Sequence, residues 1–472
     1  MRPEMKEYNM DWMVASMLQI ASRLNTCTEK EWKRMLRYIP YFKGLLETSK
    51  SAGEPGMYLF KMLNAYFDRI MSARMNKQKI CMTTFCFCPI ILESFNVAPL
   101  MVEMITAFLT VMYKRGASDY MDYCLEEGYS ETGCSSQRGT MGAYLAGMGE
   151  KIDFVVGSMG GVCDSNCNAY AFIAERLKLP IYTLNYPADI TDKDVRDYQR
   201  KDYYALIDYI QHQTGQALDE YRLRNLLIEK SKQDLIVNEI EEMQMLVPNP
   251  VKPIYLLMIY SGNLMCPGSP IYTTMLEKIR DVVRKNAENG VSGSITGKEN
   301  CRTLFFYIDH TGFSLSFWKW LDTHGISHLG GVPSRAFPEN APYASGIPGT
   351  CYHIDTKNLD TMIDSLIDIN ATMPMTRTIR GPYDAPNMWL MDTLSLCELY
   401  QADCCVYAGT PGCRNTWSNV KLMVQELEKA GYPTHIMYSD SFDLRVENWE
   451  TTSARLEEFY QVRGLLNEKE ES

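Results

Sequence analysis

Short apolar runs alternate with longer segments of helical periodicity along most of the sequence, and this alternation constrains the fold more than any other feature. Phe154–Gly157, Pro180–Leu184 and Cys404–Tyr407 have the length and apolar composition of buried strands. Ala169–Leu177 and Val420–Ala430 place apolar residues at helical spacing. Strand, helix and strand in this order are typical of a parallel sheet with crossover helices. We therefore expect an α/β fold, with a helical N-terminal part followed by two doubly wound parallel-sheet domains.

The length of 472 residues predicts more than one domain, because a single hydrophobic core stops growing at about 250–300 residues. We expect a helical N-terminal domain over 1–75, a first α/β domain with a long helical linker over 76–250, and a second α/β domain over 251–472. Within these domains, Glu93–Met112 is predicted as one helix and Pro253–Tyr260 as a strand.

Charge, hydropathy and missing motifs exclude several classes of function. The formal net charge of -11 disfavours general nucleic-acid binding, which requires a basic surface. The best candidate for a membrane segment, Ala98–Tyr113, contains Glu103 and is too short to span a bilayer. Met1–Tyr8 carries charges of both signs and lacks the apolar core of a signal peptide, so we expect a cytoplasmic protein without membrane contact. The sequence has no Walker-type phosphate loop, so we do not expect this chain itself to bind ATP.

Two of the 15 cysteines follow a short strand-like run and a glycine-rich turn. Cys163 comes after Ser158–Val162, and Cys413 comes after Ala408–Gly412. Ligands bind beyond the carboxyl ends of the strands in open α/β sheets, and glycine lets the backbone approach a ligand closely. Both cysteines are predicted to open a helix, where the backbone amides and the helix dipole favour a thiolate.

A third cysteine, Cys134, lies in the flexible polar segment Thr132–Arg138. The glycines that follow it, Gly139 and Gly142, indicate a junction between a loop and a helix. Three cysteines in three separate loops can converge on one metal centre, or they can be three buried loop cysteines. From the residues alone, these two interpretations are equally supported.

Other candidate residues have simpler explanations. Cys163 and Cys167 form a C-x3-C spacing, rather than the C-x2-C typical of zinc and ferredoxin sites. Cys404 and Cys405 lie within one strand, so their side chains are expected to point to opposite faces. Glu93 begins a helix-like segment, and its position alone favours a solvated or capping carboxylate over a functional one.

Six segments, taken in order, resemble those of the 2-hydroxyacyl-CoA dehydratase and benzoyl-CoA reductase family. They are Ile91–Pro99, Cys134–Arg138 with Gly142, Val156–Asp164, Ala402–Arg414, Asp443–Arg445 and Arg455–Phe459. Ile91, Pro99 and Cys404 stand where the family often has proline, glycine and glycine, and these departures affect none of the three cysteines above. Within the family, the length and the helical N-terminal part are most similar to the α subunit of (R)-2-hydroxyglutaryl-CoA dehydratase.

The resemblance implies a [4Fe-4S] cluster held by Cys134, Cys163 and Cys413, with one iron left open for substrate. An open position is what distinguishes a catalytic metal from a fully ligated structural one. The resemblance also implies a catalytic role for Glu93, either in proton handling or in binding the leaving hydroxyl.

The resemblance further implies partners. These are a homologous β subunit, an ATP-dependent iron–sulfur activator protein and an acyl-CoA substrate, with FMN as a candidate cofactor of the partner subunit. Arg138 and Arg414, next to two of the cysteine segments, are candidates for steadying the cluster or the CoA, and each is equally well explained as a surface cation.

The implied reaction is a radical dehydration of a 2-hydroxyacyl-CoA. The hydroxyl is α to the thioester and the departing proton is β, so neither is activated for ordinary acid–base elimination. One electron added to the thioester carbonyl gives a ketyl radical, which expels hydroxide and leaves a more acidic β proton. The expected reaction is a syn elimination that converts (R)-2-hydroxyglutaryl-CoA to glutaconyl-CoA. The alternatives are a benzoyl-CoA-reductase-like subunit, or a cluster-bearing electron-transfer or scaffold subunit without a substrate of its own.

Overall fold

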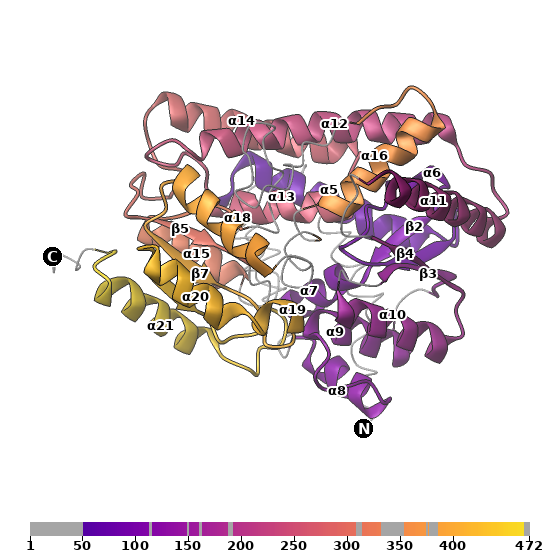
Figure 1. The fold of residues 1–472 in the computed structure, drawn as a ribbon, viewed down its shortest axis with the longest axis horizontal. Helices are drawn as coiled ribbons and strands as arrows, with labels where there is room; N and C mark the ends of the chain where they lie inside the picture. Colours follow the sequence, from indigo (N-terminus) through magenta and orange to yellow (C-terminus); the bar gives the residue numbers. More distant parts are fainter. Residues whose placement is uncertain are drawn as a thin grey trace, which may run out of the picture. The chain divides into compact units, whose positions relative to one another are not determined.

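In the computed structural model the chain divides into two compact units (Figure 1). The first is built from the described parts of Met1–Gln233, Ser261–Met275 and Tyr352–Ala371, and the second from those of Asp234–Tyr260, Leu276–Cys351 and Thr372–Ser472. The structure describes residues 51–112, 116–148, 151–159, 163–186, 192–307, 314–331, 354–373, 376 and 386–466. Residues 1–50 of the predicted N-terminal helical domain therefore lie outside the described part of the chain.

A four-stranded parallel sheet with the order β2-β1-β3-β4 forms the centre of the first unit. Its strands are β1 (Ile80–Thr83), β2 (Ala98–Met101), β3 (Phe154–Met159) and β4 (Ile181–Asn185). Its helices are α5 (Glu54–Ser72), α6 (Ile90–Ser94), α7 (Val102–Met112), α8 (Ser118–Glu126), α9 (Ser135–Leu145), α10 (Asp164–Leu177), α11 (Lys193–Thr214), the first part of α12 (Glu220–Met243) and α16 (Leu359–Thr372). Helix α10 begins after the carboxyl end of β3 and packs against both β3 and α9.

The second unit repeats this plan with the strand order β6-β5-β7-β8, again all parallel. Its strands are β5 (Cys301–Phe305), β6 (Ile326–His328), β7 (Cys404–Tyr407) and β8 (Thr434–Ile436). The remaining helices are α13 (Pro253–Met265), α14 (Pro270–Glu288), α15 (Ser314–His324), α18 (Pro386–Leu399), α19 (Arg414–Trp417), α20 (Val420–Lys429) and α21 (Trp449–Val462). The end of α13 and the start of α14 belong to the first unit, and the last part of α12 belongs to the second. The two parallel sheets, preceded by helix α5, confirm the predicted fold class. In the described part of the chain, no helix combines the length and hydrophobicity needed to cross a membrane.

Two predicted elements were wrong. Pro253–Tyr260 belongs to helix α13 and is not a strand. A fully buried apolar run has no periodicity that separates strand from helix, and here the leucines, methionine and starting proline favour the helix. Glu93–Met112 is not one helix, because strand β2 interrupts it at Ala98–Met101.

Two glycines allow α9 to pack closely against its neighbours. A Cβ atom at Gly142 would overlap the backbone carbonyl of Tyr120 on α8, and one at Gly139 would lie 2.6 Å from a methyl group of Thr106 on α7. The sequence pattern placed these glycines at a junction between a loop and a helix, whereas the structure places both inside α9. A side chain at either position would collide with α7 or α8, so the two glycines allow these helices to pack closely against α9.

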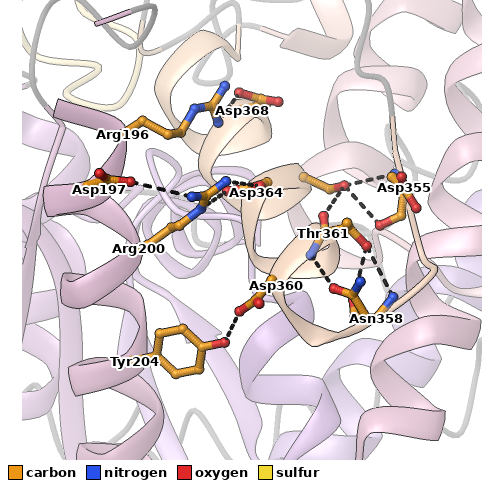
Figure 2. Close-up of polar contacts among 11 residues, drawn as sticks. Arg196, Asp197, Arg200, Tyr204, Asp355, Asn358, Asp360, Thr361, Asp364 and Asp368 are labelled. Atoms are coloured by element: carbon orange, nitrogen blue, oxygen red, sulfur yellow. Dashed lines mark hydrogen bonds and ion pairs between the residues drawn. The ribbon is translucent and has the colours of Figure 1, made fainter. Parts of the chain in front are cut away.

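Helix α16 returns to the first unit late in the sequence and is held there by a ladder of polar pairs with α11 (Figure 2). The pairs, which we call the α11–α16 ladder, are Arg196–Asp368, Arg200–Asp364 and Tyr204–Asp360. Each step is four residues on both helices, so one face of α11 meets one face of an antiparallel α16. Near the end of α16, the Asn370 carbonyl accepts the Cys88 backbone N–H at 2.6 Å, which connects this helix to the loop after β1.

Candidate functional site

Cys134 and Cys163 occupy equivalent positions on two adjacent helices of the first unit. Cys134 is the N-cap residue of α9 and Cys163 is the N-cap residue of α10, both with extended backbone conformation. Neither sulfur makes a capping hydrogen bond to its own helix. The amides and dipole of a helix N-terminus stabilise a thiolate. The prediction that Cys163 opens a helix is confirmed, and Cys134 does the same.

A series of hydrogen bonds connects the first turns of these two helices. The Cys134 backbone N–H donates to the Ser165 hydroxyl at 3.0 Å, and that hydroxyl donates to the Gln137 side-chain carbonyl at 2.8 Å. The Gln137 amide donates to the Asn166 carbonyl, and the Asn166 amide donates to the Thr84 hydroxyl at 2.6 Å. We call Ser165, Gln137, Asn166, Thr84 and the carboxylate that follows, Glu103, the buried polar chain.

Glu103 is the last residue of the buried polar chain and contacts the residues that follow strand β1. Its carboxyl accepts the Thr84 hydroxyl at 3.1 Å and the Phe85 backbone N–H at 3.2 Å. Burial raises the pKa of Glu103 to about 8, and the hydrogen bonds from the backbone and Thr84 offset only part of that rise. The first unit therefore contains a carboxyl group that gains or loses its proton near neutral pH.

Charge on either Cys134 or Cys163 affects the pKa of Tyr129. Burial is the largest cause of the raised pKa of Tyr129, and a hydrogen bond with Ser165 opposes it. Negative charge on Cys134, Cys124 and Cys163 each adds to the rise. The Tyr129 hydroxyl therefore responds to the charge state of both N-cap cysteines.

Cys413 occupies the corresponding position in the second unit, after strand β7. It is the N-cap residue of the four-residue helix α19. The Tyr307 hydroxyl donates a 2.8 Å hydrogen bond to the Cys413 sulfur, and the Tyr307 ring stacks on Tyr407 with centroids 5.3 Å apart. The Cys413 backbone N–H donates to Thr410, whose hydroxyl bonds Asp440. The prediction that Cys413 opens a helix is confirmed.

Glu93 lies elsewhere in the first unit, on the short helix α6. Its carboxylate pairs with Arg69 and lies 3.8 Å from Arg222. Arg69 also donates to the Val97 carbonyl at 2.7 Å. Burial first, and the charge of Arg222 second, lower the pKa of Arg69 to about 10. Through these contacts Glu93 joins α6 to α5 and α12, which is a structural role.

Among the residues that the structure describes, the cysteines of the second unit other than Cys413 form two buried thiol pairs on opposite faces of β7. The Cys404 sulfur is 3.8 Å from that of Cys301, and the Cys405 sulfur is 3.3 Å from that of Cys397. The predicted opposite orientation of Cys404 and Cys405 is confirmed. The paired thiol, followed by burial, raises the pKa of Cys301 and of Cys405. Raised pKa values favour the protonated thiol at Cys301 and Cys405.

The hydroxyl contacts of two predicted cluster ligands, Cys134 and Cys413, are compatible with an iron–sulfur cluster. The Ser136 hydroxyl lies 3.1 Å from the Cys134 sulfur, and Tyr307 bonds the Cys413 sulfur. Hydroxyl contacts of this kind tune clusters held by thiolates. Among the residues that the structure describes, no three His, Cys, Asp or Glu side chains are gathered to hold a metal ion. Cys134 and Cys163 belong to the first unit and Cys413 to the second, so their joint role as ligands stays a prediction.

Sequence reasoning missed the buried polar chain, although a signal was present. Ser165 and Asn166 are polar residues two and three positions after the candidate ligand Cys163, and every residue of the buried polar chain is nearly inaccessible to solvent. Glu103 was visible as a lone carboxylate within an apolar segment. A carboxylate in such a segment requires hydrogen-bond partners, but the sequence does not show which ones.

Comparison with known proteins gives one match. Residues 87–462 match the family described as 2-hydroxyglutaryl-CoA dehydratase, D-component. The matched range includes Glu93, Cys134, Cys163 and Cys413. The comparison with curated proteins gave no match.

Proposed function

Because the chain belongs to the family of the 2-hydroxyglutaryl-CoA dehydratase D-component, we propose that it is the α-type catalytic subunit of a 2-hydroxyacyl-CoA dehydratase that removes water by radical chemistry. The observation that carries this proposal is the family match over residues 87–462, which contains the three candidate ligands in the order of the family motifs. The proposed substrate is (R)-2-hydroxyglutaryl-CoA, and the proposed partners are a homologous β subunit and an ATP-dependent activator.

In this proposal Cys134, Cys163 and Cys413 hold a [4Fe-4S] cluster. When bound, the cluster supplies a Lewis-acidic iron and a one-electron relay. The chain's own contribution is to present each thiolate from a helix N-terminus, where backbone amides offset its charge. Cys163 and Cys413 are each only 7% exposed, so the protein also shields two of the sulfurs from water and oxygen.

Glu93 is proposed to handle a proton or to bind the leaving hydroxyl. Its carboxylate is held by Arg69 and Arg222, so its orientation is fixed before any substrate binds. Glu93→Gln separates this role from the structural one. A fall in kcat with an unchanged cluster and melting temperature supports the catalytic role, whereas loss of stability with kcat unchanged in the folded fraction assigns Glu93 to structure alone.

Product analysis under strictly anaerobic conditions tests the proposed function. The chain, its partner subunit, the activator and ATP are incubated with (R)-2-hydroxyglutaryl-CoA, and glutaconyl-CoA is the expected product. Benzoyl-CoA is offered separately, and reduction of its ring in place of dehydration would identify a benzoyl-CoA-reductase-like subunit. A cluster whose spectrum is unchanged by either thioester, without any product, would identify a subunit with no substrate of its own.

A further inference from the structure

The residues that connect α9 and α10 occupy matching positions on the two helices. Gln137 is the third residue after Cys134, and Asn166 is the third residue after Cys163. Residues three apart lie on the same side of a helix, so each amide is on the same side of its helix as the cysteine at the start of that helix. The Gln137 amide donates directly to the Asn166 carbonyl. The bond therefore joins equivalent points in the first turns of both helices.

Burial gives this amide pair only one satisfactory arrangement. Gln137 is 1% exposed and Asn166 is fully buried, so water cannot replace a lost partner. A buried amide left unpaired costs about 1–3 kcal/mol. The Gln137 carbonyl is committed to Ser165, and the Asn166 amide is committed to Thr84. Rotating either amide would break bonds at both of its ends, so the two helices are held in one register.

We propose that Gln137 and Asn166 are positioning residues that fix Cys134 and Cys163 relative to each other, so that the two sulfurs are set for one cluster before it is inserted. This inference rests on the proposed function, because it assumes that both cysteines are ligands. Residues that do not touch a metal but hold its ligands in place contribute about 10–100-fold to metal affinity. Neither amide touches substrate or iron in this account, and both act through the backbone at the helix starts.

The test uses the holoprotein, purified without oxygen, in three forms: wild type, Asn166→Leu and Gln137→Met. Asn166→Leu keeps the branching of the side chain and Gln137→Met keeps roughly its length, and each removes the hydrogen bond between Gln137 and Asn166. Iron release to a chelator and the electron paramagnetic resonance spectrum of the reduced cluster are measured on the folded fraction. We expect iron retention to weaken about 10–100-fold in both variants, with an altered spectrum. Gln137→Met breaks the same hydrogen bond from the other helix. If Asn166→Leu does not fold, the Gln137→Met variant alone tests the proposal.

Thr140→Val is the matched control. Thr140 is also buried on α9, and its hydroxyl bonds Thr106 at 2.8 Å and the Val102 carbonyl at 2.6 Å, but these contacts lead to α7 and away from α10. The control is expected to lose stability while keeping wild-type iron retention and spectrum. Wild-type iron retention and spectrum in both amide variants would overturn this inference and leave the proposed function standing. A wild-type protein that holds no cluster would overturn both.

Discussion

Cys163 and Cys413 each follow the third strand of a parallel sheet with the same strand order, yet their surroundings differ. Cys163 starts a helix of 14 residues, and hydrogen-bonded amides join that helix to its neighbour α9. Cys413 starts a helix of four residues and lies among aromatic rings, with Tyr307 bonded to its sulfur. The same position in one topology is thus stabilised by directional polar contacts in the first unit and by aromatic packing in the second.

This difference predicts how strongly a substitution near the cysteines destabilises each unit. Hydrogen bonds between buried amides fail completely when one partner is lost, because the other is left unsatisfied. Aromatic packing weakens more gradually, because rings can shift against each other. The first unit should therefore be less tolerant of substitution around its cysteines than the second.

The largest expected effect comes from adding one methyl group beside each site. Gly142→Ala places a Cβ against the Tyr120 backbone, which cannot move without displacing α8, and we expect a loss of about 3 kcal/mol or more. Gly409→Ala places a Cβ against the end of the Tyr407 side chain, which can shift at a lower cost than backbone can, and we expect a loss of about 1–2 kcal/mol. Urea unfolding measures both. An equal loss at the two positions would contradict the contrast between the units.

The pH dependence of stability sharpens the comparison, because the raised carboxyl pKa belongs to the first unit. The pKa of Glu103 is about 8 in the folded protein against 4.5 for an ordinary glutamate. The folded state therefore binds more protons between these values, and the free energy of unfolding falls as pH rises, by at most about 1.4 kcal/mol per pH unit.

Glu103→Gln removes this titrating group, so the free energy of unfolding should fall less steeply as pH rises. Urea unfolding from pH 4.5 to pH 8 measures the change. Glu175→Gln, which replaces an exposed carboxylate on α10, is the control and should keep the wild-type slope. A slope that is identical in the wild type and Glu103→Gln would remove Glu103 as the titrating group.

The two hydroxyl contacts to sulfur provide a smaller test. Tyr307→Phe removes the 2.8 Å donor to Cys413 and leaves the stacked ring, so the cluster should be retained at a more negative midpoint potential. Ser136→Ala removes the 3.1 Å contact at Cys134 and should shift the potential in the same direction by less. Redox titration measures both shifts. An unchanged potential in Tyr307→Phe would mean that this hydroxyl does not tune the cluster.

The smallest expected effect is in the α11–α16 ladder. The side chain of Arg200 is 40% exposed, and exposed ion pairs contribute about 0.2–1 kcal/mol. Arg200→Ala should lower the free energy of unfolding within that range. Arg284→Ala, which breaks an exposed pair with Glu239 in the second unit, is the control and should cost no more. A loss several times larger would mean that the ladder acts as one cooperative unit.

The sequence was sufficient to predict the cysteine positions but not what holds them. Strand, glycine-rich turn and cysteine are local features, so helix starts at Cys163 and Cys413 followed from short stretches of sequence. The bond between Gln137 and Asn166 joins residues that are far apart in sequence, and no local pattern identifies such a partner. Pro253–Tyr260 was misassigned for a related reason, since burial on all sides removes the periodicity that separates strand from helix.

Iron and acid-labile sulfide content of protein purified without oxygen tests the central claim most directly. The set comprises wild type, Cys134→Ser, Cys163→Ser and Cys413→Ser, with Cys404→Ala as the matched control from the neighbouring strand. A [4Fe-4S] cluster predicts about four iron and four sulfide per chain in the wild type and the control, with both lost in each serine variant. Zinc or no metal in the wild type, or full iron in any serine variant, would contradict the assignment of these three cysteines as cluster ligands.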